Sequence, residues 1–167
     1  RRRNGGIRLL GLIDQREVVS ATYSELDKGF TELTLDEGAS LSKFEFLEDG
    51  AEYRETIAAK DGAPTVAHEL TFTLERMDAD TAAAIEAIIE ASRSGLIAVV
   101  VTINGDALLL GYSQEFGKER PLRIASAQAT TGRLLSETTS ETVTLRSEDV
   151  SKARPLLDDL NNLFSKI

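Results

Sequence analysis

The chain has 167 residues, of which 41% are hydrophobic and 28% charged, and its formal net charge is −9. A chain of this length buries roughly 70% of the surface of its unfolded state, so it needs neither a disulfide nor a metal ion to fold. It contains no cysteine, which excludes disulfide frameworks, thiolate metal sites and thiol nucleophiles. No apolar run approaches the roughly 18 residues of a membrane span, so we expect a single domain over residues 1–167 that makes no use of a membrane.

The acidic residues concentrate between Glu25 and Asp61. An acidic surface repels the phosphates of nucleic acid, whereas stable binding needs Lys and Arg to neutralise them. The exception is a basic N-terminal arm over residues 1–6, which begins with consecutive arginines. Such an arm is either a solvated tail or a segment that docks on an acidic neighbouring subunit.

Apolar residues predict a first strand over residues 7–13 and a second over residues 17–23. The polar stretch Ser24–Ser40 follows, and it is either one long loop or a loop that holds a short hairpin. The apolar residues of that hairpin would be Phe30, Leu33 and Leu35. Ordered loops of this length inside compact domains are usually functional.

A concentration of carboxylates marks the next segment. Apolar and polar residues alternate over Leu41–Glu48, and Asp49-Gly50 predicts a turn into a strand at Ala51–Ala59, so the two strands are expected to form a hairpin. The carboxylates that this hairpin would bring together are Glu45, Glu48, Asp49, Glu52 and Glu55. Two carboxylates suffice for general acid–base catalysis, but a run of this kind is more often a solvated surface.

A strand and a helix are predicted after this hairpin. Alternation over Thr65–Met77 predicts a long strand. The following alanine- and isoleucine-rich segment predicts a helix, with Asp78 or Asp80 as its N-cap and Gly95 just past its end.

The segment Leu96–Tyr112 predicts a tight hairpin that turns at Asn104-Gly105, a pair that favours the type I′ turn. Its apolar runs do not alternate, so both faces of the hairpin must be covered. Two further strands are predicted over residues 122–129 and 142–146.

The C-terminal residues 151–167 have leucines and a phenylalanine at helical spacing, which predicts an amphipathic helix. Either Ser151 caps it or Pro155 occupies its first turn, and its apolar face packs on its own sheet or on a neighbouring subunit. The expected fold is therefore mainly β, a sandwich or barrel of antiparallel strands, with one flanking helix and this C-terminal helix.

Chemistry-bearing motifs are scarce. His68 is the only histidine and lies in the middle of a predicted strand, with no nucleophile–base pattern around it. Gly5-Gly6 lacks the glycine spacing and the lysine of a phosphate-binding loop. We therefore expect no catalytic residue, no cofactor and no metal site, and a protein that is not an enzyme.

Several segments resemble the tail-tube proteins of long-tailed phages and prophages, including prophages of Bacteroidota-type bacteria. The matching segments are the opening Gly5-Gly6-Ile7, the strand HELTFTLERM before a helix, the segment VVVTINGDALLLGY, and ATTGRLLSETTSETVTLRSE from Ala129 to Glu148. The predicted C-terminal helix is longer than that family's pattern.

The resemblance implies a virion protein, assembled in the host cytoplasm, whose hexameric rings stack into a tube. Its partners would be further copies of itself and other phage tail or connector proteins, and DNA would pass through the tube without specific binding. Edge strands would pair with neighbouring subunits into a closed ring, which leaves no free edge.

The resemblance also gives two candidate sites. The candidate lumen surface is the acidic hairpin, with Glu45, Glu48, Asp49, Glu52 and Glu55. The candidate contact between rings is the Ser24–Ser40 loop, with Phe30, Leu33, Leu35 and Asp36. The alternatives are a head–tail completion or minor tail protein that forms one ring, a small β-sandwich binding module and, least favoured, an enzyme that uses the acidic hairpin.

Overall fold

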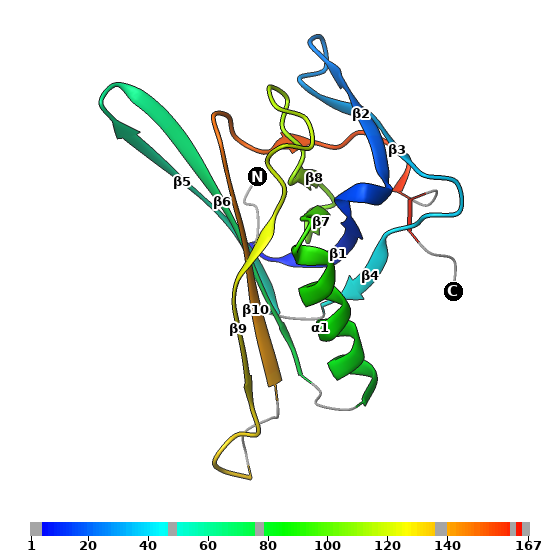
Figure 1. Ribbon diagram of the computed structural model, residues 1–167, viewed down its shortest axis with the longest axis vertical. Helices are drawn as coiled ribbons and strands as arrows, with labels where there is room; N and C mark the ends of the chain where they lie inside the picture. Colours follow the sequence, from blue (N-terminus) through cyan, green and yellow to red (C-terminus); the bar gives the residue numbers. More distant parts are fainter. Residues whose placement is uncertain (1–4, 47–49, 76–78, 136–139, 161–162, 165–167) are drawn as a thin grey trace.

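The computed structural model describes residues 5–46, 50–75, 79–135, 140–160 and 163–164 (Figure 1). The strands are β1 (Ile7–Asp14), β2 (Val18–Ser24), β3 (Gly29–Leu35), β4 (Ser42–Glu45), β5 (Ala51–Lys60), β6 (Ala63–Leu74), β7 (Leu96–Thr102), β8 (Ala107–Leu110), β9 (Arg123–Thr130), β10 (Ser140–Asp149) and β11 (Arg154–Pro155). A 3-10 turn, η1 (Gln15–Glu17), follows β1, and the helix α1 (Ala79–Ser92) connects β6 to β7.

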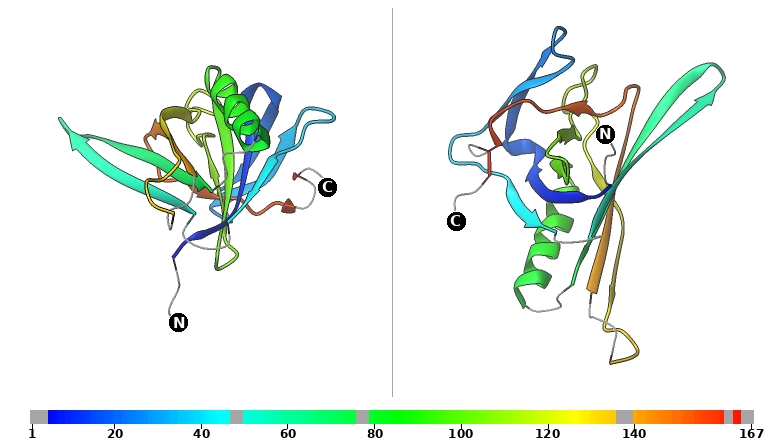
Figure 2. Two further views of the ribbon diagram at one scale, coloured as in Figure 1. Left: turned by 90° about the horizontal axis from the view of Figure 1, so that it is seen from below. Right: turned by 180° about the vertical axis from the view of Figure 1, so that it is seen from behind.

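The strands form three sheets. A five-stranded sheet has the order β11-β8-β7-β1-β4, a four-stranded sheet has the order β5-β6-β10-β9, and β2 pairs with β3 alone. Every pairing between these strands is antiparallel. The prediction of a mainly antiparallel β fold with a helix between its strands is confirmed. The far part of the β5–β6 hairpin projects from the body of the molecule (Figures 1 and 2).

Strand β7 lies at the centre of the core, and its residues from Leu96 to Val101 are all buried. Ala98 and Val100 pack with side chains of the four-stranded sheet and of α1. Ile97 and Val99 pack with side chains of the β2–β3 hairpin and of the C-terminal segment. Both faces of this strand are therefore covered, as its unbroken apolar run predicted.

The turn between β7 and β8 differs from the type I′ expectation. Only Gly105 has a positive φ, of 90°, in this turn. The Thr102 N–H donates to the Asp106 carbonyl and the Gly105 N–H donates to the Thr102 carbonyl, at 2.8 and 2.9 Å. These bonds enclose a three-residue loop, in which a left-handed glycine at the last position is sufficient.

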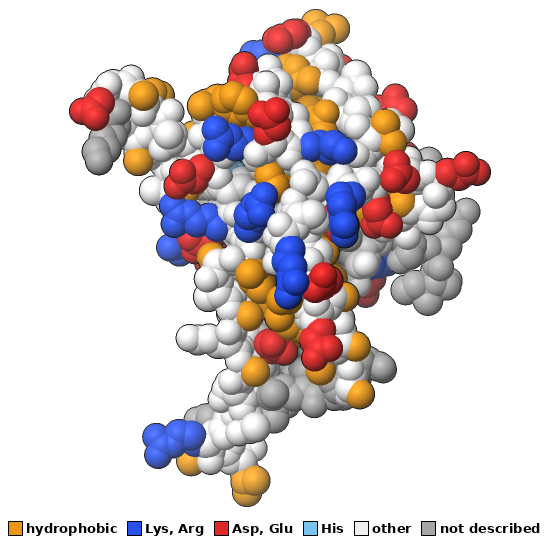
Figure 3. All heavy atoms as spheres, in the orientation of Figure 1, with side chains coloured by type: hydrophobic (Ala, Val, Ile, Leu, Met, Phe, Trp, Pro, Cys, Tyr) orange, Lys and Arg blue, Asp and Glu red, His pale blue; other side chains and the backbone are white. Residues whose placement is uncertain are grey.

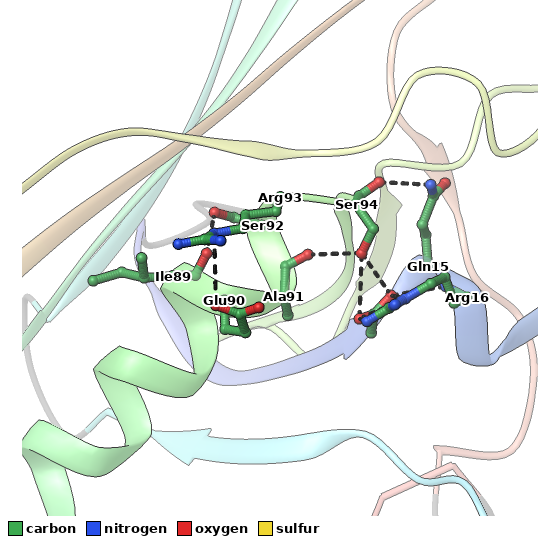
Figure 4. Close-up of polar contacts among 9 residues, drawn as sticks. Gln15, Arg16, Ile89, Glu90, Ala91, Ser92, Arg93 and Ser94 are labelled. Carbon is green, nitrogen blue, oxygen red and sulfur yellow. Dashed lines mark hydrogen bonds and ion pairs between the residues drawn. The ribbon is translucent and has the colours of Figure 1, made fainter.

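The C-terminal end of α1 is fixed to the end of β1 (Figure 4). The Gly95 N–H donates to the Ala91 carbonyl at 3.0 Å, and the φ of Gly95 is +115°. The Gln15 side-chain amide donates to the Ser94 carbonyl at 2.6 Å, and the Ser94 hydroxyl donates to the Asp14 carboxylate at 3.2 Å. The first bond satisfies a carbonyl of the last helical turn, and the other two join the residues after the helix to β1.

The predicted hairpin over residues 41–59 is wrong. Strand β4 pairs with β1, and β5 pairs with β6, so the two segments belong to different sheets. A turn signal such as Asp49-Gly50 reports only local backbone preference, whereas the pairing depends on which distant strands offer a matching edge. Asp49 itself lies outside the described residues.

The predicted C-terminal helix is also wrong for the part of residues 151–167 that the structure describes. Arg154 and Pro155 pair with β8 as β11. The Leu157 N–H then donates to the Phe30 carbonyl at 2.8 Å, and the Leu41 N–H donates to the Leu163 carbonyl at 2.8 Å. The backbone bonds offered by β8, β3 and the segment before β4 outweigh the helical preference of the leucine pattern, because propensity is only a weak prior against tertiary contacts.

Candidate assembly surface

The four-stranded sheet has one face against the core and one polar face. Along β6, the side chains of Val66, His68, Leu70 and Phe72 are buried, and those between them point the other way. The outward residues that the strand register places together include Glu52, Arg54, Thr56, Ala67, Glu69, Thr71, Thr73, Arg123, Ser126, Gln128, Thr142, Thr144, Arg146 and Glu148. We call this surface the polar face; it carries no large apolar side chain.

Hydroxyl and ion pairs hold the polar face together. Threonines opposite one another on β6 and β10 are hydrogen-bonded, Thr71 to Thr144 at 3.3 Å and Thr73 to Thr142 at 3.0 Å. Arginine side chains pair with glutamates two residues away on the same strand, Arg54 with Glu52 and Arg146 with Glu148. Arg54 and Arg146 are thus each balanced by a carboxylate, which reduces their attraction for phosphates.

Both edges of the four-stranded sheet are open. In the described part of the chain no strand pairs with the outer edge of β5 or of β9. An eight-residue strand such as β9 presents an edge of roughly 27 Å, because each residue adds about 3.4 Å. A groove of about 860 Å³ runs beside β5, between residues 50–54 and the N-terminal Gly5 and Gly6.

Strand β9 has an unusual composition for an open edge. Its residues from Ala125 to Thr130 are all exposed, and they are small or uncharged: Ala125, Ser126, Ala127, Gln128, Ala129 and Thr130. Monomeric proteins commonly block such edges with lysine, proline or an inward-pointing charge. These residues offer none of those protections, so β9 is suited to pair with another strand.

The predicted acidic site is not assembled as one surface. Glu45 lies on β4 in the five-stranded sheet, whereas Glu52 and Glu55 lie on β5. Glu52 belongs to the polar face and Glu55 to the opposite face, because they are an odd number of residues apart. Glu48 and Asp49 lie outside the described residues.

Glu55 fixes the C-terminal segment to the sheet. Its Oε1 atom accepts hydrogen bonds from the Tyr53 hydroxyl and from the Ala153 N–H, both at 2.8 Å, and its Oε2 lies 3.7 Å from the Lys152 ammonium. Burial, together with this hydrogen bond, raises the pKa of Tyr53 above its ordinary value. Glu55 therefore has a structural role within the subunit.

The predicted contact loop is a hairpin whose apolar residues face the core. Phe30 and Leu33 on β3 are buried in the cluster that covers one side of β7, and Leu35 packs partly against it. The Asp36 N–H donates to the Glu17 carbonyl at 2.8 Å, which closes the base of the hairpin. Neither possibility that the sequence left open is observed as stated, because residues 29–35 form one strand that pairs with the preceding strand β2 rather than a hairpin contained within Ser24–Ser40.

The more exposed of two exposed large apolar residues of this hairpin, Val19 on β2 and Leu26, is Leu26, in the turn between β2 and β3. Sequence reasoning missed it because Leu26 lies among polar residues and has no periodic partner. The exposed Leu134 and Leu135, in the connection after β9, were missed for the same reason. The signal available in the sequence was a leucine inside an otherwise polar turn.

His68 makes a backbone contact within the core. The His68 side chain is buried, and its Nε2 lies 2.9 Å from the Ser151 carbonyl oxygen. Among the described residues, no group of three or more histidine and acidic side chains could hold a metal ion, and no helix is long and apolar enough to cross a membrane.

Comparison with known protein families, curated protein sequences and solved structures gives no match to this chain.

Proposed function

We propose that this protein is a self-assembling structural protein of a phage tail, whose rings stack into a tube that conducts DNA. The observation that carries the proposal is the four-stranded sheet, with its polar face and its two open edges. Head-to-tail pairing of β9 of one copy with β5 of the next uses both edges at once. Such a heterologous contact closes into a ring when the rotation from one copy to the next is a whole fraction of a turn, which is the arrangement proposed here.

The inner surface of the proposed ring is the polar face. Three carboxylates on it, Glu52, Glu69 and Glu148, stand against three arginines, Arg54, Arg123 and Arg146, so the surface carries no net positive charge for binding phosphates. The β-sandwich core and α1 then lie outside this inner layer. Of the acidic residues named from the sequence, Glu52 alone is kept as a lumen candidate among those described.

The resemblance to tail-tube proteins supports six copies in each ring, and it supports other tail or connector proteins as further partners. A protein that forms one ring only, at the head–tail junction or in a minor tail position, would use the same edge contact. The difference between the two is whether rings stack.

The first test is negative-stain electron microscopy of the purified protein at low and high concentration, together with sedimentation velocity. We expect rings of uniform diameter, and tubes as the concentration rises. Rings that never stack would place the protein in the one-ring class. A sample that stays monomeric at high concentration would contradict the proposal.

The edge contact is tested with proline on β9. The N–H groups of an edge strand point alternately toward the sheet and away from it, so one of Ala127→Pro and Gln128→Pro removes an outward N–H only. We expect that variant to keep the melting temperature of the wild type and to remain monomeric. Threonine at the same position is the matched control, because it restores the N–H and suits a strand. Rings formed by both proline variants would rule out pairing through β9.

A further inference from the structure

The outer part of β5 carries an apolar side chain that its own subunit leaves uncovered. Ile57 lies opposite the buried Val66 of β6, so it is on the core side of the four-stranded sheet, but it is 62% exposed. The β5–β6 hairpin projects from the body here, and Figure 3 shows hydrophobic side chains exposed on the projecting part. A single exposed apolar residue is common on protein surfaces, so exposure alone assigns no partner to Ile57.

The core side of β9 combines small side chains with an open edge. Ala127 lies opposite the buried Val143 of β10 and Ile124 opposite the buried Leu145, with Ala125 as an extra residue in β9. Ala127 is exposed and Ile124 is half-buried. Small residues at an edge leave room for larger side chains on a strand that pairs with it, because side chains directly opposite one another are close neighbours.

The relative direction of β5 and β9 in the proposed ring follows from the sheet itself. Strand β5 is antiparallel to β6, β6 to β10, and β10 to β9, so β5 and β9 run in opposite directions. A rotation about the ring axis keeps the direction of every strand along that axis, so β9 of one copy and β5 of the next run antiparallel. The rotation also keeps the core sides together. The register between copies must therefore shift by an even number of residues, because a slip of one residue exchanges the faces.

The size of the shift follows from the tilt of strands in a closed barrel, which is about 35–45°. Within one copy, a row straight across the sheet joins Ala127, Val143, Phe72 and Ala51, so an untilted ring would place Ala127 opposite Ala51 of the next copy. Four strands span roughly 19 Å and four residues roughly 14 Å, so a shift of four residues gives a tilt of about 35°. A shift of two residues gives about 20° and a shift of six about 47°. Four is the even shift that falls within the range.

The overlap of the two strands fixes the direction of this shift. A shift of four residues toward the outer part of β5 places Ala127 opposite Glu55 and Thr130 opposite Glu52, and all of β9 then lies beside β5. The same shift in the other direction places Ala127 opposite position 47 and Arg123 opposite Gly50. Strand β5 begins at Ala51, so that direction leaves β9 without a partner strand.

We propose that β9 pairs with β5 of the next copy in this register, with Ile124 opposite Ile57 and Ala127 opposite Glu55. This inference rests on the ring assembly proposed above and names the residues that meet at its seam. Ile57 is removed from water against Ile124, which favours closure of the ring. The small Ala127 leaves room for the Glu55 side chain, which stays bonded to its own C-terminal segment.

The first experiment uses the absence of cysteine from the chain. Thr56→Cys with Ser126→Cys places thiols at positions that the register sets opposite one another between copies. Within one copy they lie on the two outer strands of the sheet, roughly 14 Å or more apart, which is too far for a disulfide. We expect mild oxidation of the rings to give a ladder of covalent oligomers on a non-reducing gel, ending at the complete ring. Glu52→Cys with Ser126→Cys, opposite one another in an untilted ring, is the matched control and should give little cross-linking.

The second experiment replaces the apolar residue at the seam. Ile57→Glu should raise the protein concentration at which rings form at least about tenfold, which corresponds to about 1.4 kcal/mol. Val19→Glu, at an exposed position of β2 that is 53% exposed, is the matched control and should leave ring formation unchanged. The melting temperature of each dilute variant should stay at the wild-type value, because both side chains lie outside the core.

These outcomes separate the register from the ring assembly. Rings that cross-link through the Glu52 pair, or through neither pair, overturn the register and leave the ring standing. Rings of Ile57→Glu at the wild-type concentration also overturn it. A wild-type protein that forms no ring overturns the proposed function itself.

Discussion

The five-stranded and four-stranded sheets differ in how much of each is covered by the chain's own residues. The central strand of the five-stranded sheet, β7, has side chains packed on both of its faces. The four-stranded sheet has one face in the core, and its other face and both of its edges are open. The first sheet ends in two short strands, the two-residue β11 and the four-residue β4, whereas the edges of the second are long. Another copy of the chain could therefore bind to the second sheet without displacing core side chains.

The largest expected effect is the loss of stability when a side chain on the buried face of β6 is truncated, compared with one on its polar face. Phe72 is fully buried and its ring lies 6.0 Å from that of Phe44 and 6.3 Å from that of Phe46. Phe72→Ala should lower the free energy of unfolding by about 3–5 kcal/mol, because it leaves a cavity. The neighbouring Thr71→Ala, on the polar face, should cost about 1 kcal/mol or less, mainly through its pair with Thr144. Denaturant unfolding of both variants makes the comparison, and equal losses would contradict the difference between the faces.

A second pair of substitutions tests the two faces of β5. Glu55→Ala leaves the half-buried Tyr53 hydroxyl and the Ala153 N–H without their acceptor, so it should cost about 1–2 kcal/mol. Glu52→Ala removes an exposed ion pair with Arg54 and should cost about 0.5 kcal/mol or less. Thermal unfolding measures both. A larger loss for Glu52→Ala would mean that the polar face contributes more to the subunit than its exposure implies.

A sequence prediction was correct where its signal came from neighbouring residues and wrong where the structure depends on residues far apart in the chain. Alternation along β6 and the unbroken apolar run of β7 identified both strands, because the burial of a strand face determines which of its neighbouring residues are apolar. The pairing of β4 and β5 was misjudged because the Asp49-Gly50 signal is local, whereas strand pairing is set by distant edges. The C-terminal leucines have helical spacing, but Leu157 and Leu163 form backbone bonds with distant segments.

The candidate surface was harder to predict than the strands. Only the register between β6, β10 and β5 shows that Thr71, Thr144 and Glu52 share one face. The open edges depend on the order of strands in the sheet, which the sequence order does not give. Acidic residues close together in the sequence were therefore a poor guide, since Glu52 and Glu55 face opposite sides of β5.

A third prediction concerns DNA on the polar face. Thr71→Arg with Thr142→Arg adds two guanidinium groups to the proposed lumen on the inner strands β6 and β10, away from the β9 edge, and should leave ring assembly intact while making DNA bind. Each added phosphate contact should steepen the logarithmic salt dependence by roughly 0.9 for duplex DNA. The control places arginines at Ala82 and Ala83, exposed residues of α1, which packs on the core side of the sheet. Equal DNA binding by both variants, measured by fluorescence anisotropy against salt, would place the polar face outside the lumen.

The smallest effect concerns the junction of β1 and α1, which lies within the covered part of the molecule. The hydrogen bond with the Arg16 side chain is the main cause that holds the pKa of Asp14 below its ordinary value. Because the unfolded chain takes up the proton first, the ionised Asp14 stabilises the fold above its unfolded pKa of about 3.9. That stabilisation is lost as the pH falls through the lower folded value.

Asp14→Asn should therefore lower the free energy of unfolding by about 0.5 kcal/mol at pH 7, since the Arg16 partner is exposed. The difference between the variant and the wild type should shrink as the pH is lowered below about 4. Thermal unfolding at pH 7 and near pH 3 measures it. A difference that persists at pH 3 would assign the role of Asp14 to its shape and its bond from Ser94 rather than to its charge. The junction would then be stabilised by packing, as β7 is.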